Sequence, residues 1–570
     1  YRSVKEEKVV ASKKTELAIT IDKILNRNHL NNGQEYQNNQ SNQNNINSQQ
    51  KNNNYIDNNT NNNINQNDFE AINNSNNQDK VLLSIENDFK ELSSSKYKIS
   101  KLRVKSSIKE LANADRDTLA ADYLTRKYYK NNNEYLWISK EGITPSSALL
   151  IDSLEALASI GFSPRKFISK EVKKDIEKIQ TLSIEEGESI SKILARIEYR
   201  LTKALFRYAI GERFGYVTPS YILNRLDTAE TKNGARRYQR LYDIHTETVD
   251  TNFVHQLVSS VANDSLQQFL HRLKSERPLY RNFQSLLKNA SARSSKMKVL
   301  VNMERSRWRQ NDFPELHKKY VLVNVPSFYL RAVDEDSVLT MRVACGALST
   351  KTPLLNSAIE RMDVNPQWVM PLSIVKKQVI SQLGNRYYFD SHRYFIRSAT
   401  TGKEIDVAQV TPEMLLSGAY KVVQRGGKGN ALGRIVFRFP NNFSVYLHDT
   451  SSREAFSRFD RDVSHGCIRV EKPLELAIFL LQDKEETLID KLRYSTTIDI
   501  QMQPRGNEKD NSATKIDRKR LINSKSLKPS VPLFITYYTL YPDENGVMQD
   551  YPDVYGYDKA IASYLLNYID

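Results

Sequence analysis

The hydrophobic period of this chain changes at about residue 297, and this change divides the chain into two kinds of structure. Before it, apolar residues recur at helical spacing, most clearly at Ile190, Ile193, Leu194, Ile197, Leu201, Ala204, Leu205 and Tyr208. Such a stripe predicts an amphipathic helix, which Gly211, Gly215 and Pro219 would end. After it, segments such as YVLVNVPSFYLRAV at 320–333 alternate in the manner of strands. The pattern predicts an α+β protein of several domains.

Composition and pattern together predict the domain boundaries. In chain order we expect an N-terminal segment at 1–27, an Asn/Gln-rich linker at 28–79, a helical scaffold domain at 80–295, a mostly β domain at 296–504, a basic linker at 505–528 and a C-terminal segment at 529–570. The linker at 28–79 has too few apolar groups to offset the entropy of ordering, so it is predicted to be disordered. The polar segment 374–421 interrupts the strand pattern and predicts an inserted lid.

Finer features are predicted within these domains. KVLVNME, at 298–304, is interpreted as the first strand of the β domain, and VPLFITYYTLY, at 531–541, as its last. Further helices are expected at 146–160 and 254–270, and PLELAIFLLQD, opened by Pro473, is expected to be helical.

The charge of the chain favours an acidic partner. The 570 residues carry a formal net charge of +16, with a pI near 9.3. Nucleic acid, an anionic membrane surface and a polyanionic wall polymer would all fit, as would a generally cationic surface with no specific partner. Because no RRM, KH or zinc-finger pattern accompanies the charge, we do not expect a nucleic-acid partner. No apolar run is long enough to span a membrane, and the chain begins at Tyr1, so an export signal could have been removed or left out.

The chemistry of the chain concentrates in FSVYLHDT, at 443–450, and SHGCIRV, at 464–470. Cys467 follows a glycine, with histidines and an arginine close in sequence, which is the setting that a thiolate nucleophile requires. His448 would take the thiol proton, giving a thiolate–imidazolium pair. Period-two alternation places Ser444, Tyr446 and His448 on one face, so we expect His448 to face an open cleft.

The residues around the cysteine predict a further division of roles. The backbone N–H groups of Gly466 and Cys467 can face a developing oxyanion. The planar fork of Arg469 suits a substrate carboxylate. Two alternatives stay open at this point: His448 as a structural hydrogen-bonding residue, and a zinc site made of histidines, Cys467 and Asp449. The second cysteine, Cys345, lies in an apolar strand and is interpreted as a small buried hydrophobic residue.

These residues resemble the signature of the L,D-transpeptidases of bacterial peptidoglycan, the YkuD type, in which a strand histidine precedes [S/T]-[H/S]-G-C-[IV]-[RN]. Further blocks resemble the large, YcbB-type subgroup: NMERSRW, VNVPSFYL, NPQWVMPLSIV, GNALGRIVFRFPN, and in the helical region YLTRKYYKNNNEYLWISKEG. The resemblance implies a YkuD-type β catalytic domain with a capping lid at 374–421, beside an α-helical scaffold domain on which the C-terminal segment 529–570 packs. The subgroup's small peptidoglycan-binding domain has no room before NMER.

The resemblance also assigns roles. It implies that Cys467 is the nucleophile, His448 the general base, and the backbone carbonyl of Asp449 the group that orients the imidazole. Residues lining the substrate site would be Tyr446, Ser464, His465 and Arg469. No metal and no cofactor are expected. The family further implies a periplasmic, exported protein whose cysteine is acylated by carbapenems.

The reaction implied is a two-step acyl transfer from a tetrapeptide stem. Cys467 attacks the third stem residue, D-alanine leaves, and an amine then resolves the thioester, either as a 3→3 cross-link or by attaching an outer-membrane protein to the wall. Water as acceptor would make the enzyme an L,D-carboxypeptidase. The competing hypotheses are a cysteine peptidase of ordinary L-peptides and a non-catalytic wall-binding scaffold.

Overall fold

The computed structural model of the chain describes residues 100–131, 135–139, 142–181, 183–230, 236–498 and 516–570. The segments predicted at 1–27 and 28–79 lie outside these residues. The chain divides into two compact units. A helical unit takes the described residues up to Tyr216, together with Thr248–Ser291 and Leu565–Asp570, and a mainly β unit takes Val217–Glu247 and Ala292–Tyr564.

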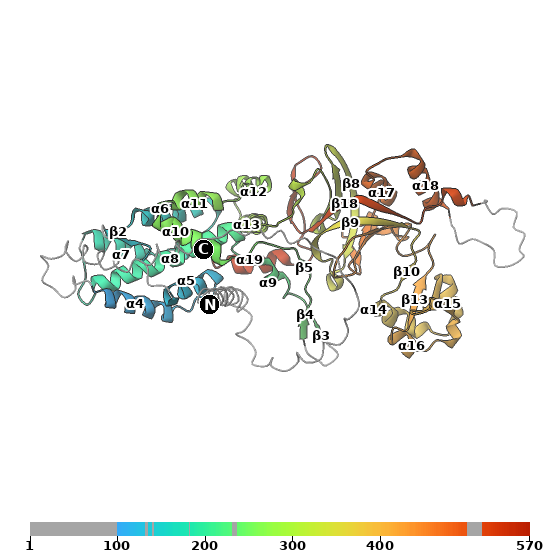
Figure 1. Cartoon of the computed structure of the whole chain (residues 1–570), viewed down its shortest axis with the longest axis horizontal. Coiled ribbons are helices and arrows are strands. Elements are labelled where there is room, and N and C mark those ends of the chain that lie inside the picture. The colour runs from blue at the N-terminus through green and yellow to red at the C-terminus, as the bar shows by residue number, and fades with distance from the viewer. Residues whose placement is uncertain (1–99, 132–134, 140–141, 182, 231–235, 499–515) are drawn as a thin grey trace, which may run out of the picture. The chain divides into compact units, whose positions relative to one another are not determined.

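The helical unit is built around one long helix, α8 (Ile190–Phe214). The predicted apolar stripe is confirmed, and Gly215, with φ of +94°, ends the helix. Shorter helices surround α8 (Figure 1): α4 (Lys101–Ala114), α5 (Ala120–Asn131), α6 (Pro145–Glu155), α7 (Lys170–Thr181), α10 (Thr251–Ala262), α11 (Leu266–Leu273) and α12 (Pro278–Asn289). The helix expected at 254–270 is thus two helices, α10 and α11.

A buried carboxylate ties the short hairpin β1 (Ile138–Ser139) and β2 (Gly142–Ile143) to α8. The Glu198 carboxylate is fully buried and accepts hydrogen bonds from the Leu136 N–H at 2.6 Å, the Trp137 N–H at 3.0 Å and the Tyr129 hydroxyl at 2.8 Å. Burial raises the pKa of Glu198 to about 7, although these hydrogen bonds act to lower it. The carboxylate therefore has a structural role in the helical unit.

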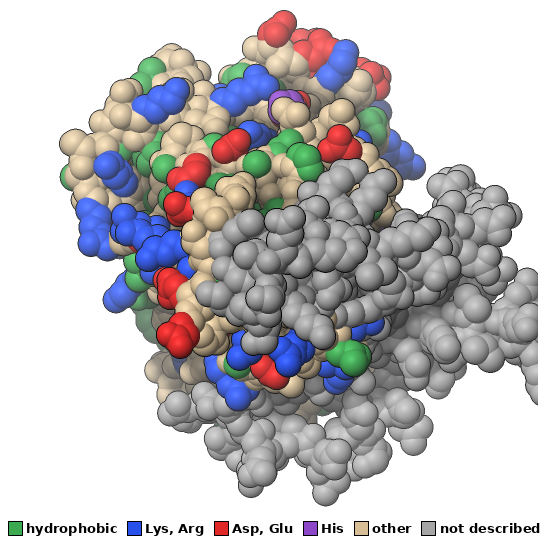
Figure 2. Space-filling model, turned by 90° about the vertical axis from the view of Figure 1, so that its left-hand side faces the viewer, with side chains coloured by type: hydrophobic (Ala, Val, Ile, Leu, Met, Phe, Trp, Pro, Cys, Tyr) green, Lys and Arg blue, Asp and Glu red, His purple; other side chains and the backbone are tan. Residues whose placement is uncertain are grey.

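Basic side chains of the helical unit are interspersed with acidic ones. Figure 2 shows this mixture on the face of the molecule that it presents. Many are paired: Arg196 with Asp175 and Glu188, Lys203 with Asp115 and Asp117, and Arg207 with Asp117 and Asp122. In this unit much of the positive charge is therefore used within the fold.

The last residues of the chain belong to the helical unit. Tyr568 is buried among Phe162, Phe167 and Tyr216, with ring centroids 4.9 to 6.1 Å away, and its carbonyl accepts a hydrogen bond from the Ser163 N–H. Only Leu565–Asp570 is assigned to this unit. The residues of this segment up to Tyr564 belong to the mainly β unit, and the packing of 529–570 on the scaffold domain stays a prediction.

The mainly β unit is organised by one large sheet with the strand order β14-β15-β17-β8-β7-β6-β18-β9-β5, in which β9 also pairs with β14, so that the path of strands closes on itself (Figure 1). The strands are β5 (Tyr242–Asp243), β6 (Lys319–Asn324), β7 (Tyr329–Asp334), β8 (Ser337–Gly346), β9 (Leu354–Val364), β14 (Ile435–Arg438), β15 (Leu447–His448), β17 (Ile468–Val470) and β18 (Ser524–Thr536). Val321, Val323 and Leu330 are fully buried, as the alternation predicted for this region.

One strand prediction for this unit is wrong, and the bounds of another change. KVLVNME belongs to a helix, α13 (Arg293–Arg307), whose residues from Val299 to Arg307 are all buried. Periodicity alone does not distinguish a helix buried on all sides from a strand. The last strand, β18, begins at Ser524, inside the predicted linker, and it lies between β6 and β9 because it pairs with both. The segment after it forms a hairpin, β19 (Leu540–Pro542) and β20 (Met548–Asp550), and a helix, α19 (Tyr557–Leu565).

The inserted segment has a sheet and a core of its own. Its strands, in the order β10-β13-β11-β12, are β10 (Trp368–Val369), β13 (Tyr420–Gln424), β11 (Tyr394–Ser398) and β12 (Glu404–Ile405), and Figure 1 shows helices α14 (Leu372–Ile374), α15 (Arg386–Ser391) and α16 (Pro412–Leu416) around them. Buried Val379, Phe389 and Ile396 belong to one apolar cluster within it. Its role as a lid stays a prediction.

The remaining elements of the β unit are small. They are α9 (Pro219–Leu223), the hairpin β3 (Thr228–Glu230) and β4 (Arg236–Tyr238), β16 (Asp462–Ser464), α17 (Pro473–Leu480), which was predicted, and α18 (Glu486–Thr497). No helix in the described ranges has the length and apolar character needed to cross a membrane.

Candidate active site

Two short parallel strands bring the predicted histidine and cysteine segments together. β15 pairs with β17 so that Leu447 lies opposite Ile468 and His448 opposite Arg469. Cys467 immediately precedes β17, and the Ile468 N–H donates to the Tyr446 carbonyl at 2.9 Å. The 19 positions between His448 and Cys467 are thus bridged by neighbouring strands of one sheet.

The environment of His448 fixes its tautomer. Its Nδ1 is hydrogen-bonded to the backbone carbonyl of Asp449, and because a carbonyl oxygen only accepts, Nδ1 carries the proton. Nε2 is then left with a lone pair. Burial lowers the pKa of His448 to about 4, and the nearby Arg469 and Arg438 also act to lower it. The imidazole is therefore neutral near pH 7 and able to accept a proton.

The position of His448 differs from the one expected. We predicted an open cleft, but the side chain is only 5% exposed. The predicted alternation does not extend to Ser444, whose φ of +55° takes it out of the strand, and β15 has only two residues. Within this short stretch Val445 and Leu447 are buried as predicted, while Tyr446 is half-buried.

Cys467 is half-exposed and in the thiol form. Burial raises the pKa of its thiol, while a backbone hydrogen bond from Tyr446 and the charges of Arg438 and Arg469 act to lower it. A neutral thiol and a neutral imidazole differ from the thiolate–imidazolium pair that we expected, because burial disfavours the charged form of each group.

The second cysteine is placed as predicted. Cys345 is fully buried in β8, and burial raises the pKa of its thiol to about 12. Both cysteines are free. Cys345 is therefore not a competing nucleophile.

The turn before Cys467 is held by its own side chains. The Ser464 hydroxyl accepts from the Gly466 N–H at 3.1 Å and donates to the Cys467 carbonyl, and Ser464 is buried. One prediction therefore needs correction: the Gly466 N–H is already used and is not free for an oxyanion. Ser464 shapes the turn, and its place in a substrate site stays a prediction. Gly466 is needed for its φ of +109°.

The Cys467 N–H is the donor that remains. Among the residues that the structure describes, none accepts a hydrogen bond from it. It belongs to the same residue as the Cys467 sulfur, so a carbonyl attacked by that sulfur would come near this N–H. The sequence predicted this donor together with Gly466, and only one of the two is available.

The other predicted site residues have different surroundings. His465 is exposed, which leaves it outside the closely packed part of the site. Arg469 is partly buried, and in the described parts of the chain no carboxylate lies within ion-pair distance of it, so its charge is available to a ligand. The Arg438 guanidinium carbon lies over the Tyr446 ring, 4.3 Å from the ring centroid.

Two residues near the site were missed from the sequence. Arg438 forms an ion pair with Asp363 at 2.8 Å and covers the Tyr446 ring. Strand alternation could have indicated this residue, because Val436 pairs with His448 and Arg438, two positions further along the strand, lies on the same face. Gly433 was the second. A Cβ there would lie 2.4 Å from the Asp449 side chain, whose carboxylate accepts from the Arg434 N–H at 2.8 Å. No sequence pattern that we considered signals that contact.

The structure gives no metal-binding cluster in its described residues: no group of three or more His, Cys, Asp and Glu side chains is arranged to hold an ion. The Asp449 carboxylate is committed to Arg434 and to Arg453, whose Nη1 lies 3.4 Å away. The alternative of a zinc site therefore has no geometric support here.

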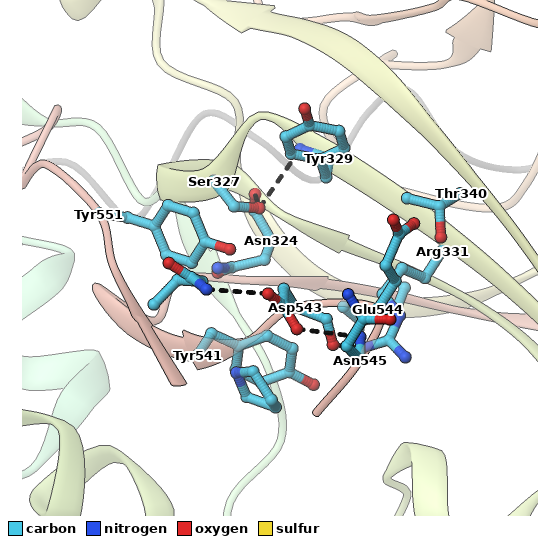
Figure 3. Close-up of a pocket in the computed structure, with 13 residues that line it drawn as sticks. Asn324, Ser327, Tyr329, Arg331, Thr340, Tyr541, Asp543, Glu544, Asn545 and Tyr551 are labelled. Atoms are coloured by element: carbon cyan, nitrogen blue, oxygen red, sulfur yellow. Dashed lines mark hydrogen bonds between the residues drawn. The ribbon is translucent and has the colours of Figure 1, made fainter. Parts of the chain in front are cut away.

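A separate hollow of about 210 Å³ lies between strands β6 to β8 and the β19–β20 hairpin (Figure 3). None of the predicted site residues lines it. Its Asp543 carboxylate accepts from Gln549 at 2.8 Å and from the Asn545 and Val547 N–H groups, so it holds the hairpin together. We assign this hollow no part in catalysis.

Comparison with known families agrees with this geometry. The model of the YkuD family, described as the L,D-transpeptidase catalytic domain, matches residues 318–499. The chain contains a YkuD L,D-transpeptidase catalytic domain. A second family model, described as the scaffold domain, matches residues 122–287, which lie in the helical unit. The YkuD domain includes β15, β17 and the turn before Cys467.

Individual relatives carry related names. The chain is 29% identical over 315 residues to a Haemophilus influenzae protein named "Putative L,D-transpeptidase", an alignment that covers 55% of this chain and 59% of that protein. Two solved structures align weakly. An L,D-transpeptidase from Mycobacterium smegmatis has 13% identity, a TM-score of 0.17 and coverage of 28% of this chain and 53% of its own. The Ldtfm-avibactam carbamoyl enzyme has 11% identity, a TM-score of 0.18 and coverage of 45% and 70%.

Proposed function

We propose that this chain is a peptidoglycan L,D-transpeptidase that forms a thioester on Cys467. The proposal is carried by one observation: the His448 imidazole is held through Nδ1 on the Asp449 carbonyl, with its basic nitrogen free, on the strand next to Cys467. The YkuD domain at 318–499 supports a peptidoglycan substrate. The same arrangement gives Cys467, His448 and the Asp449 carbonyl the roles of nucleophile, base and orienting group.

In the first step the neutral pair reacts as substrate binds. His448 Nε2 takes the thiol proton while the sulfur attacks the carbonyl carbon of the third stem residue, and the Cys467 N–H stabilises the negative oxygen. The imidazolium then returns the proton to the nitrogen of the departing D-alanine, and the C–N bond breaks. The product is a thioester between Cys467 and the third stem residue.

In the second step an amine attacks the thioester and releases the cysteine. A side-chain amine of another stem gives a 3→3 cross-link, an amine of an outer-membrane protein attaches that protein to the wall, and water gives a carboxypeptidase. Arg469 would hold a stem carboxylate, since its charge has no carboxylate partner among the described residues. Tyr446 and His465 are proposed to line the same site.

The setting follows from the substrate. Peptidoglycan lies outside the cytoplasmic membrane, so we propose that the protein is exported and acts in the periplasm. The match of a scaffold domain at 122–287 supports the YcbB-type subgroup. Helix α12 ends at Asn289 and helix α13 begins at Arg293, which leaves no room between them for a peptidoglycan-binding domain.

Intact-mass spectrometry with a carbapenem tests the proposal. We expect one covalent addition, localised to Cys467 by peptide mapping, and none in Cys467→Ala. Incubation with a disaccharide tetrapeptide should release D-alanine, and stems made only of L-residues should not react. An unmodified wild-type protein, or turnover of all-L peptides alone, would refute it.

A further inference from the structure

Among the residues described, one side chain donates a hydrogen bond to the carbonyl of the peptide between Gly466 and Cys467. Thr352 Oγ1 lies 3.0 Å from the Gly466 carbonyl oxygen. The same hydroxyl accepts from the Gly346 N–H at 2.8 Å, and because a carbonyl oxygen only accepts, the hydroxyl is the donor to Gly466. Thr352 is fully buried. This contact therefore has a defined direction.

The geometry of that peptide connects Thr352 to the reacting centre. In a planar trans peptide the carbonyl of Gly466 and the N–H of Cys467 point in opposite directions. A hydrogen bond that fixes the carbonyl thus also fixes the direction of the Cys467 N–H, the one donor left for an oxyanion. It also polarises the peptide, which strengthens the N–H as a donor.

Thr352 is in turn held by residues that lie after the YkuD domain in sequence. The Tyr555 hydroxyl accepts from the Thr352 N–H at 3.1 Å and donates to the Gly346 carbonyl at 2.7 Å. The Tyr555 N–H donates to the Tyr537 hydroxyl at 2.8 Å, and that hydroxyl donates to the Asp553 carboxylate at 2.7 Å. Both tyrosines are 3% exposed.

An ion pair between a buried lysine and a partly exposed aspartate secures the loop that carries Thr352. Lys351 Nζ lies 2.8 Å from both carboxylate oxygens of Asp227 and 5.3 Å from the centre of the Tyr557 ring. The lysine side chain is 5% exposed. The loop from Gly346 to Thr352 is therefore fixed from two sides, and neither Asp227 nor Tyr555 lies in residues 318–499.

We propose that Thr352 is a positioning residue for acyl transfer: it aims the Cys467 N–H at the oxyanion, and Tyr555 holds it in place. The inference rests on the proposed function. It also makes the segment 537–555 a required part of the active site, although this segment lies outside the residues that match the catalytic family.

Two reagents that attack the same sulfur separate this role from a general effect on the thiol. Acylation by a carbapenem passes through a tetrahedral oxyanion, whereas alkylation by iodoacetamide does not. In Thr352→Val, which removes the hydroxyl at nearly constant volume, we expect acylation to slow by roughly 10- to 100-fold. Losing an oxyanion donor altogether costs roughly 10²- to 10³-fold. Alkylation should stay within about twofold.

The chain offers matched controls. Thr352→Ser keeps the hydroxyl and should restore acylation to near the wild-type rate. Thr350→Val removes a hydroxyl that donates to the Ser464 carbonyl at 2.9 Å. That carbonyl still accepts a hydrogen bond from the Ala347 N–H, so we expect a small effect on the acylation rate. Tyr555→Phe, which removes the support of Thr352, should slow acylation by an intermediate factor.

The outcomes are distinct. A wild-type protein that is not acylated at all refutes the proposed function. If the wild type is acylated and Thr352→Val reacts equally fast, the positioning role is refuted and the proposed function stands. If alkylation and acylation slow equally in a variant whose melting temperature is unchanged, Thr352 acts on the thiol and not on the oxyanion, which also refutes the inference.

Discussion

Two buried ionisable groups, one in each unit, show what burial alone does and does not indicate. Glu198 in the helical unit and His448 in the YkuD domain are both displaced from their ordinary pKa, to about 7 and about 4, and desolvation is the main cause in each. They differ in what their polar atoms do. Both oxygens of the Glu198 carboxylate accept hydrogen bonds, whereas His448 uses only Nδ1.

That difference separates a structural group from a reactive one. The Glu198 carboxylate meets three donors that belong to the fold, so its hydrogen bonds are the reason that it is buried. His448 is buried with a basic nitrogen that no protein donor uses in the described residues. A perturbed pKa identifies both as unusual, and only the uncommitted lone pair identifies one as a candidate base.

The largest expected effect tests the reactive half of this comparison. His448→Ala should slow acylation of Cys467 by roughly 10²- to 10⁴-fold, because burial raises the thiol pKa and the variant lacks the proposed base. The rate would be measured by intact-mass spectrometry at pH 7.5. The melting temperature serves as the control for folding. A variant that is folded and acylated at the wild-type rate would show that the thiol ionises without His448.

The second prediction uses pH, because the two groups have opposite signs. The raised pKa of Glu198 means that the folded helical unit binds more protons than the unfolded chain between pH 4.5 and about 7, so this group's contribution to stability falls as pH rises through that window. The lowered pKa of His448 means that the unfolded chain binds more protons between about pH 4 and 6.5, so its contribution falls as pH decreases through that window. Each contribution amounts to about 3 kcal/mol at most.

Hydrogen exchange at pH 5 and pH 7.5, corrected for the intrinsic rates, measures both contributions. In Glu198→Gln, peptides from α8 should lose the gain in stability toward low pH that the titration of Glu198 gives the wild type. In His448→Gln, peptides from β14 to β17 should lose the gain in stability toward high pH that the titration of His448 gives. If the two variants shift the pH dependence in the same direction, the comparison between the two groups fails.

A third, smaller effect tests the structural half. At pH 8, Glu198→Gln should destabilise the helical unit by about 1–3 kcal/mol, since the amide NH₂ would face a backbone N–H that now donates to a carboxylate oxygen. Urea unfolding followed by tryptophan fluorescence is suitable because Trp137 is one of the two residues whose backbone N–H donates to Glu198. Acylation of Cys467 in the folded variant should be unchanged. Loss of acylation without loss of stability would contradict a purely structural role.

The sequence predicted the fold where patterns are local. The stripe on α8 and the strand around Val321 and Val323 were confirmed, although burial extends beyond the predicted faces to Glu198 in α8 and to Leu322 and Asn324 in β6. It was wrong at α13, which is buried on all sides from Val299 onward and so shows no period, and it did not predict that β18, distant in sequence, pairs with both β6 and β9. Pairing over such distances is decided by tertiary contacts that no local pattern contains.

The site shows the same limit. The sequence placed His448 at the end of a strand with Cys467 within reach through an intervening loop, and the resemblance to the YkuD type named the Asp449 carbonyl, because short motifs fix the types of residue and their spacing. It did not predict that Ser464 would occupy the Gly466 N–H, nor that Thr352 would bind the next carbonyl. Hydroxyl groups of serine and threonine bind whatever backbone atoms the fold brings near them, and their partners here become known only when the loop at 346–352 is placed.

The smallest expected effect concerns a third ionisable group, His465, which extends the comparison to an exposed residue. His465 adjoins Gly466 in sequence but is exposed, and the turn that precedes Cys467 is held by Ser464 and Thr352 without its side chain. His465→Ser should therefore change the rate of carbapenem acylation by no more than roughly twofold, the range typical of surface substitutions. Side-by-side acylation of this variant and His448→Ala under the same conditions makes the contrast measurable. A loss of tenfold or more in His465→Ser would mean that an exposed imidazole takes part in proton transfer. An uncommitted lone pair alone, without burial of the ring, would then be enough to identify a histidine as a base.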